Sequence, residues 1–224
     1  MNKQPISKQD LSLNGVDTPL QVTEIFDTIQ GEGPWSGLPC TFIRLAGCNL
    51  RCTWCDTEYT RFDEMYLEEI AKRINHEHVV ITGGEPFRQN IRYLINKLAE
   101  AGKRVQIETN GTLYVPFIDY GFVTIVCSPK TPTLNRNLLH HIDHFKYVIG
   151  EEDLESLDGF PTKGTQGNTQ APYKSDWFFG EPTLMPRDDK DEEKNQRNTE
   201  TTIKLVQKYG FRLNLQTHKL LNLP

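Results

Sequence analysis

Segments typical of buried strands alternate along this chain with segments of helical periodicity. The apolar runs at residues 39–47 and 78–86 end in glycine or polar residues, whereas residues 65–76 and 88–102 place leucine and isoleucine on one helical face. Further strands are expected at residues 104–112, 121–130, 144–150 and 211–218, and a last helix at residues 198–210. This alternation predicts an α/β fold with a parallel sheet and right-handed crossovers. About six such units are too few for a closed eight-stranded barrel, so we expect an incomplete (β/α) barrel or an open twisted sheet.

Polar or glycine residues follow five of the expected strands. They are Cys48, residues 83–85, residues 108–111, residues 128–130 and residues 216–218. Because the carboxyl ends of parallel strands meet at one edge of the sheet, these residues are expected to line a single active site. The pattern therefore favours an enzyme.

Composition limits the partners and the compartment. The net charge of −5 argues against non-specific nucleic-acid binding, which usually needs a basic excess. The first twenty residues lack a run of signal-peptide type, and no segment approaches the ~18 apolar residues of a membrane span. We therefore expect a cytoplasmic protein with no membrane partner, in which thiols stay reduced.

Three of the five cysteines lie close together, at Cys48, Cys52 and Cys55. Disulfides are the weakest interpretation in a reducing compartment, and a structural zinc site usually has four ligands. Three thiolates on one loop suit an iron–sulfur cubane with one iron open to another ligand. On spacing alone, a zinc-stabilised binding module stays open as an alternative. Cys40 and Cys127 lie within apolar strands and are interpreted as core residues.

Two stretches interrupt the alternation. Residues 161–176 are polar and rich in glycine, threonine and glutamine, so we expect a long loop. Residues 187–197 form a charge run, which we interpret as a mobile, solvated loop before the last helix.

The motifs resemble those of a known enzyme family. The C-x₃-C-x₂-C spacing, followed about thirty residues later by ITGGEP, resembles the signature of the radical S-adenosylmethionine (SAM) superfamily. Together with EIFDTIQGEGPWSG, QIETNGT, SPK and the final QTHKLLNLP, it is similar to the 7-carboxy-7-deazaguanine synthase family. The match runs from about residue 24 to residue 224. We therefore expect residues 1–22 to form an N-terminal extension and residues 23–224 a single radical SAM domain.

The resemblance implies a reaction and its cofactors. The family converts 6-carboxy-5,6,7,8-tetrahydropterin to 7-carboxy-7-deazaguanine with release of ammonia, on the route to queuosine. It uses a [4Fe–4S] cluster, SAM and Mg²⁺, and the cofactors supply the radical chemistry. The resemblance also implies a homodimer and an external, flavodoxin-like electron donor. A related radical SAM enzyme acting on another substrate, or activating a partner protein, is the alternative.

The resemblance assigns roles to individual residues. It implies that the cluster ligands are Cys48, Cys52 and Cys55, and that Thr57 binds magnesium. The residues that it implies for SAM are Trp54, Cys55, Asp56, Gly84, Glu85, Glu108, Ser128, Pro129, Lys130, Met185 and Pro186. Those that it implies for the substrate are Ile29, Gln30, Gly31, Glu32, Arg44, Thr82, His218 and the terminal carboxylate of Pro224.

Arg44 keeps two interpretations. It lies within an apolar strand, where a buried guanidinium needs an anionic partner. The substrate carboxylate would serve, and so would a structural ion pair with Glu24 or Glu32.

Overall fold

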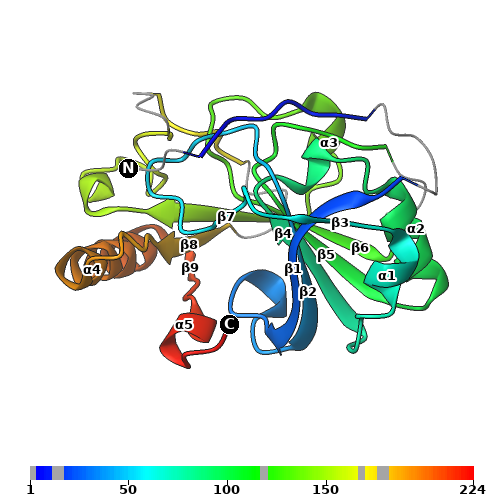
Figure 1. Cartoon of the computed structure of the whole chain (residues 1–224). Coiled ribbons are helices and arrows are strands. Elements are labelled where there is room, and N and C mark those ends of the chain that lie inside the picture. Colours follow the sequence, from blue (N-terminus) through cyan, green and yellow to red (C-terminus); the bar gives the residue numbers. More distant parts are fainter. Residues whose placement is uncertain (1–3, 12–17, 117–120, 166–169, 176–181) are drawn as a thin grey trace.

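The computed structural model describes residues 4–11, 18–116, 121–165, 170–175 and 182–224. Within these residues the strands form one nine-stranded sheet in the order β3-β1-β2-β4-β5-β6-β7-β8-β9 (Figure 1). The strands are β1 (Leu20–Ile29), β2 (Pro39–Leu45), β3 (Asp63–Met65), β4 (His78–Gly83), β5 (Arg104–Thr109), β6 (Val123–Cys127), β7 (His144–Ile149), β8 (Thr183–Pro186) and β9 (Arg212–Leu213).

Helices and short helical turns connect these strands. They are η1 (Gly33–Trp35), α1 (Leu67–Ala71), η2 (Pro86–Arg88), α2 (Arg92–Glu100), α3 (Arg136–Leu139), η3 (Glu151–Asp153), α4 (Glu192–Tyr209) and α5 (Thr217–Leu220). The strands from β2 to β9 are parallel, apart from β3. The sheet stays open between its edge strands β3 and β9, which confirms the incomplete barrel.

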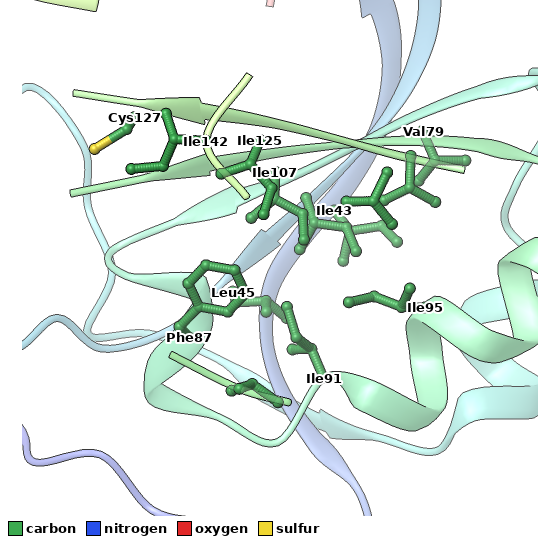
Figure 2. Close-up of a cluster of buried hydrophobic side chains, with 14 of the residues drawn as sticks. Ile43, Leu45, Val79, Phe87, Ile91, Ile95, Ile107, Ile125, Cys127 and Ile142 are labelled. Atoms are coloured by element: carbon green, nitrogen blue, oxygen red, sulfur yellow. The ribbon is translucent and has the colours of Figure 1, made fainter. Parts of the chain in front are cut away.

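The core lies between the parallel strands and the connecting helices. Figure 2 shows Ile43, Ile107 and Ile125 of the sheet together with Ile91, just before α2, and Ile95, within α2. All these side chains are buried, because they lie in the cluster formed between the sheet and α2. The sequence reasoning placed Cys40 and Cys127 in the core, and both are fully buried.

The sequence pattern missed three strands: β8, and β1 and β3 at one edge of the sheet. β1 runs antiparallel to β2, and β3 runs antiparallel to β1. Buried and partly exposed residues alternate irregularly along β1, so it lacks the apolar run that revealed the parallel strands. The expected domain start at residue 23 falls inside this strand.

The interpretation of residues 187–197 as a loop was wrong for residues 192–197 and holds for residues 187–191, which lie outside any helix or strand. α4 already begins at Glu192, and the Asp191 side chain accepts a hydrogen bond from the Lys194 amide at its start. Charged residues are good helix formers, and the acidic Glu192 and Glu193 favour the first turn through the helix dipole. The second half of the charge run is therefore the solvated beginning of a helix.

Two further expectations about the C-terminal part need correction or lie partly outside the described residues. The strand expected at residues 211–218 is only the two residues of β9, and Thr217 and His218 belong to α5. In the loop expected at residues 161–176, the described parts bond to the segment after β6, through Thr165 to Lys130 and Tyr173 to Thr131. Residues 166–169 and 176 lie outside the described part. No described helix is long and apolar enough to cross a membrane.

Candidate active site

A cavity of about 840 Å³ opens where the parallel strands end, a size typical of small-molecule sites. Most residues that the sequence predicted for the site line it. They are Cys48, Cys52, Trp54, Cys55, Asp56, Thr57, Gly84, Glu108, Ser128, Lys130, Met185 and Pro186 on the predicted cofactor side, and Ile29, Gln30, Glu32, Arg44, Thr82, His218 and Pro224 on the predicted substrate side. The fold therefore brings together, around one cavity, residues that are far apart in the sequence.

Gly31, Glu85 and Pro129 lie outside the cavity wall. A Cβ atom on Gly31 would lie 2.0 Å from His218 Nδ1, so glycine at this position lets α5 approach the end of β1. Glu85 is fully buried, and burial raises its pKa to about 7. Its carboxylate accepts hydrogen bonds from Thr109 Oγ1 and from the Asn110 amide, both at 2.7 Å. Glu85 thus joins the ends of β4 and β5, and its predicted contact with the cofactor stays a prediction.

The cysteine loop, residues 47–61, forms one wall of the cavity. Cys48, Cys52 and Cys55 carry free thiols and pack in a small cluster with Leu50 and Tyr59. Burial raises the pKa of Cys48 to about 12. In the part of the chain that the structure describes, no three His, Cys, Asp or Glu side chains already converge on a metal position. The loop supplies the ligand types for a metal cluster.

Gly83 and Gly84, at the end of β4, pack closely against the backbone where the cysteine loop begins. A Cβ atom on Gly84 would lie 2.1 Å from the Gly47 carbonyl oxygen. A Cβ on Gly83, where φ is +139°, would lie 2.0 Å from the Leu45 oxygen. Only glycine allows the two backbones to come this close. The close approach sets the distance between the first cysteine and the G-G-E-P turn.

A charged trio of Glu32, Lys146 and Glu108 forms the part of the cavity wall nearest the sheet. Lys146 Nζ donates to Glu32 Oε2 at 2.5 Å and to Glu108 Oε2 at 2.9 Å, and its side chain is 6% exposed. Burial alone would raise the pKa of Glu32, but the Lys146 ammonium and the Gln216 amide lower it to about 2. Burial raises the pKa of Glu108, and the neighbouring Glu32 acts in the same direction. The trio holds its carboxylates in fixed positions at the bottom of the sheet-side wall.

The sequence reasoning did not single out Lys146 and Lys219 of the wall, and it gave Gln216 no role beyond its place among the strand-end residues expected at the active site. Gln216 Nε2 donates to Glu32 Oε1 at 2.7 Å. Lys219 Nζ lies 2.8 Å from Asp56 Oδ2 and 2.6 Å from Asp188 Oδ2, so it bridges the cysteine loop and the segment after β8. Lys146 carried the same signal as Arg44, a charged residue within an apolar strand, and could have been found by it. Gln216 and Lys219 show their role only once α5 is placed.

Arg44 adopts the ion-pair interpretation in this structure. Its Nε lies 2.6 Å from Glu24 Oε1, on the neighbouring strand β1. The guanidinium also lies 5.6 Å from the centre of the Phe26 ring. Because the Arg44 side chain is 23% exposed and lines the cavity, it can still meet a ligand anion from the same position.

One cation, Lys130, and the hydroxyls of Ser128 and Thr57 complete the cofactor side. Lys130 Nζ donates to Ser128 Oγ at 2.6 Å and lies 5.2 Å from the centre of the Trp54 ring. Burial lowers the pKa of Lys130. Thr57 Oγ1 donates to Asp56 Oδ1 at 3.3 Å, so its oxygen keeps acceptor capacity toward the cavity. The donor set of soft thiols beside hydroxyl and carboxylate oxygens fits an iron–sulfur cluster next to a hard cation.

Comparison with known proteins agrees with this geometry. The model of the radical SAM superfamily matches residues 42–148. The chain is 40% identical over 221 residues to the 7-carboxy-7-deazaguanine synthase of Rhodospirillum rubrum, covering 91% of this chain and 92% of the relative. It is 39% identical over 227 residues to the enzyme of the same name from Rickettsia prowazekii, covering 94% and 92%.

A solved structure gives the same result. The crystal structure of QueE from Escherichia coli superposes with a TM-score of 0.64 at 25% sequence identity, covering 88% of this chain and 93% of that one. Sequence relatives and structural neighbour agree with the motifs and with the cavity. The chain belongs to the 7-carboxy-7-deazaguanine synthase family of radical SAM enzymes.

Proposed function

We propose that this enzyme converts 6-carboxy-5,6,7,8-tetrahydropterin to 7-carboxy-7-deazaguanine with release of ammonia. One observation carries the proposal beyond family membership. The cysteine loop and the residues implied for the substrate line the same cavity. Radical chemistry needs this arrangement, because the reactive group and the substrate must meet with water excluded.

Cys48, Cys52 and Cys55 would hold a [4Fe–4S] cluster and leave one iron for SAM. When bound, cluster and SAM supply the electron and the radical that removes a hydrogen atom from the substrate. The chain's own residues bind and orient. Gly84, Trp54 and Asp56 line the cavity beside the cysteines and would contact the methionine end of SAM. Further contacts to SAM are proposed for Glu108, Ser128, Pro129, Lys130, Met185 and Pro186.

The substrate would lie on the sheet side of the cavity. Its ring N–H groups are hydrogen-bond donors, which suit the carboxylates of the charged trio, above all Glu32. Its carboxylate suits Arg44, whose guanidinium would exchange or share its Glu24 partner. Gln30, Thr82, His218 and Pro224 line the same part of the cavity and would complete the contacts.

A magnesium ion would bind between the two ligands. Thr57 offers one hydroxyl oxygen next to the Asp56 carboxylate. Because Mg²⁺ usually keeps water and ligand oxygens in its shell, one protein oxygen is enough to place it beside the substrate carboxylate.

The partners and the setting follow the family. The electron donor would be a flavodoxin-like reductase that reaches the cluster from outside, and the enzyme would act as a homodimer in the cytoplasm. Residues 23–224 would form the radical SAM domain, with residues 1–22 as an extension of it.

The test is an anaerobic turnover assay. The chain is reconstituted with iron and sulfide, reduced, and given SAM, Mg²⁺ and the carboxytetrahydropterin, and 7-carboxy-7-deazaguanine is measured by mass spectrometry. We expect product in step with substrate loss. SAM cleavage without this product would instead favour a related radical SAM enzyme with another substrate. Binding of zinc, with no iron taken up, would refute radical chemistry altogether.

A further inference from the structure

The N-terminal strap, defined as residues 4–10, lies along the cysteine loop. These residues fall outside the motifs that define the family match. In Figure 1 the dark-blue segment passes beside the cyan loop that precedes β3. Two isolated parallel bridges fix its course, from Ile6 to Cys48 and from Asp10 to Gln89.

Gln4 holds the far end of the cysteine loop. Its side-chain Nε2 donates to the Thr57 carbonyl oxygen at 2.8 Å, and its Oε1 accepts from the Tyr59 amide at 2.8 Å. Its main-chain oxygen accepts from Arg51 Nε at 2.8 Å. A single residue therefore contacts the loop at three points, on both sides of Cys55.

The rest of the strap joins the loop to η2, the helical turn that follows the G-G-E-P glycines. The Ser7 amide donates to the Cys48 carbonyl oxygen at 2.8 Å. The Asp10 amide donates to the Arg88 oxygen at 2.9 Å, and Gln9 Nε2 donates to the Phe87 oxygen at 2.8 Å. The strap thus connects the first cysteine, the residues after the last cysteine, and the turn that follows G-G-E-P.

The cysteine loop needs such support because residues 49–62 contain no helix or strand. Within it, the main-chain bond from Cys55 to Cys52 is a local turn, and the bond from Gly47 to Tyr59 closes its base. Neither bond fixes Thr57. The Thr57 carbonyl oxygen accepts a hydrogen bond from the Gln4 side-chain amide. This bond fixes the backbone between Cys55 and the proposed magnesium ligand Thr57.

We propose that the N-terminal strap is a positioning element of the active site, and that Gln4 fixes the cysteine loop and Thr57 for cluster and cation binding. The proposal rests on the cluster site described under the proposed function. Gln4 is a positioning residue, since it acts through the loop backbone and does not line the cavity.

The test compares Gln4→Met with Lys8→Met. Methionine keeps the length of the side chain and removes both amide hydrogen bonds, and Lys8 is an exposed residue of the same strap. Each reconstituted protein is given a ferrous-iron chelator under anaerobic conditions, and the rate of iron release is followed. Amide hydrogen exchange of the reconstituted proteins is measured in parallel, comparing a peptide that covers residues 56–60 with one from β5.

We expect Gln4→Met to release iron roughly tenfold faster than wild type and to lose exchange protection in residues 56–60 while β5 stays protected. Lys8→Met should behave as wild type. Equal rates and equal protection in both variants would overturn the proposal, as would a loss of protection spread evenly through the chain. Wild-type protein that takes up no iron would instead refute the proposed cluster site, so the two failures are distinguishable.

Discussion

The two walls of the cavity are built on different principles. On the sheet side, Glu32, Lys146 and Glu108 satisfy one another before any ligand arrives. On the loop side, Cys48, Cys52 and Cys55 form no disulfide, and Gln4, from a distant segment of the chain, holds the backbone at Thr57 and Tyr59. The sheet wall is thus preorganised by strand register, whereas the loop wall is completed by what binds to it.

The difference follows from where the residues lie. Glu108 and Lys146 are fixed on β5 and β7, on either side of β6, so the ladders set their spacing. The cysteines lie on a loop between β2 and β3, where no ladder sets a distance. A rigid wall suits a substrate that must be held in one orientation, and an adaptable wall suits a cluster that is inserted after folding.

The sharpest test of this contrast removes one thiol from each kind of environment. Cys52→Ala should abolish iron uptake and turnover, because three ligands are the minimum for the proposed cluster. Cys40→Ala is the matched control, since Cys40 is buried in β2 away from the cavity. Iron and labile sulfide are measured after anaerobic reconstitution. Full iron uptake by Cys52→Ala would contradict the loop-wall assignment.

The next largest effect is expected from breaking the trio. Lys146→Met leaves two buried carboxylates without their cation and should lower the free energy of unfolding by about 3–5 kcal/mol at pH 8. Denaturant unfolding measures this. The double variant Lys146→Met with Glu108→Gln should recover part of the loss, because only one unpaired carboxylate remains. Strict additivity of the two substitutions would show that the groups are not coupled.

The stability of wild type and that of Lys146→Met should depend on pH in opposite directions. In wild type the pKa of Glu32 is lowered to about 2, so its contribution to stability is present above the unfolded pKa and is lost as pH falls toward 2. In Lys146→Met burial raises the pKa of the carboxylates instead, so stability is lost as pH rises through that raised pKa. The deficit of the variant should therefore shrink toward pH 4. A deficit independent of pH would indicate lost packing only.

A smaller effect is expected where sheet and loop touch. Gly84→Ala places a methyl group 2.1 Å from the Gly47 oxygen and should cost about 1–3 kcal/mol by overpacking. It should also impair iron retention, because it pushes the loop away from β4. Gly102→Ala is the control: its added Cβ meets open space, and its φ of +69° makes it strained but far from the cysteines. Thermal unfolding and iron content are compared. Normal iron retention in Gly84→Ala would show that the loop tolerates the displacement.

The smallest effect is expected from Lys219, which joins the cysteine loop to the segment after β8. Lys219→Met removes the bridge between Asp56 and Asp188, a partly exposed pair of contacts that should contribute less than about 1 kcal/mol and weaken with salt. The KM for SAM should rise while kcat changes little, since the bridge holds Asp56 on the loop. Lys97→Met breaks an exposed pair with Glu68 on α2 and α1 and should leave KM unchanged. A change in kcat alone would contradict a role in holding the loop.

Local sequence was sufficient for the parts of the molecule that depend on short-range pattern. The apolar runs correctly predicted β2, β4, β5, β6 and β7, because buried parallel strands appear in a sequence as nearly continuous apolar segments. Cys40 and Cys48 were separated correctly into core and loop by their immediate neighbours. α4 was predicted too short because charge was taken as a sign of disorder, although it marks the exposed face of that helix.

The sequence by itself determined the fold class, the family and the chemical types gathered at the strand ends, since these follow from periodicity and from motifs of fixed spacing. Only the tertiary structure decided which groups pair. Lys146 neutralises carboxylates 114 and 38 positions away, Lys219 bridges to the loop, and Gln4 reaches Thr57 and Tyr59. Such contacts join residues that are distant along the chain, and their free energy depends on burial and geometry that no local pattern contains.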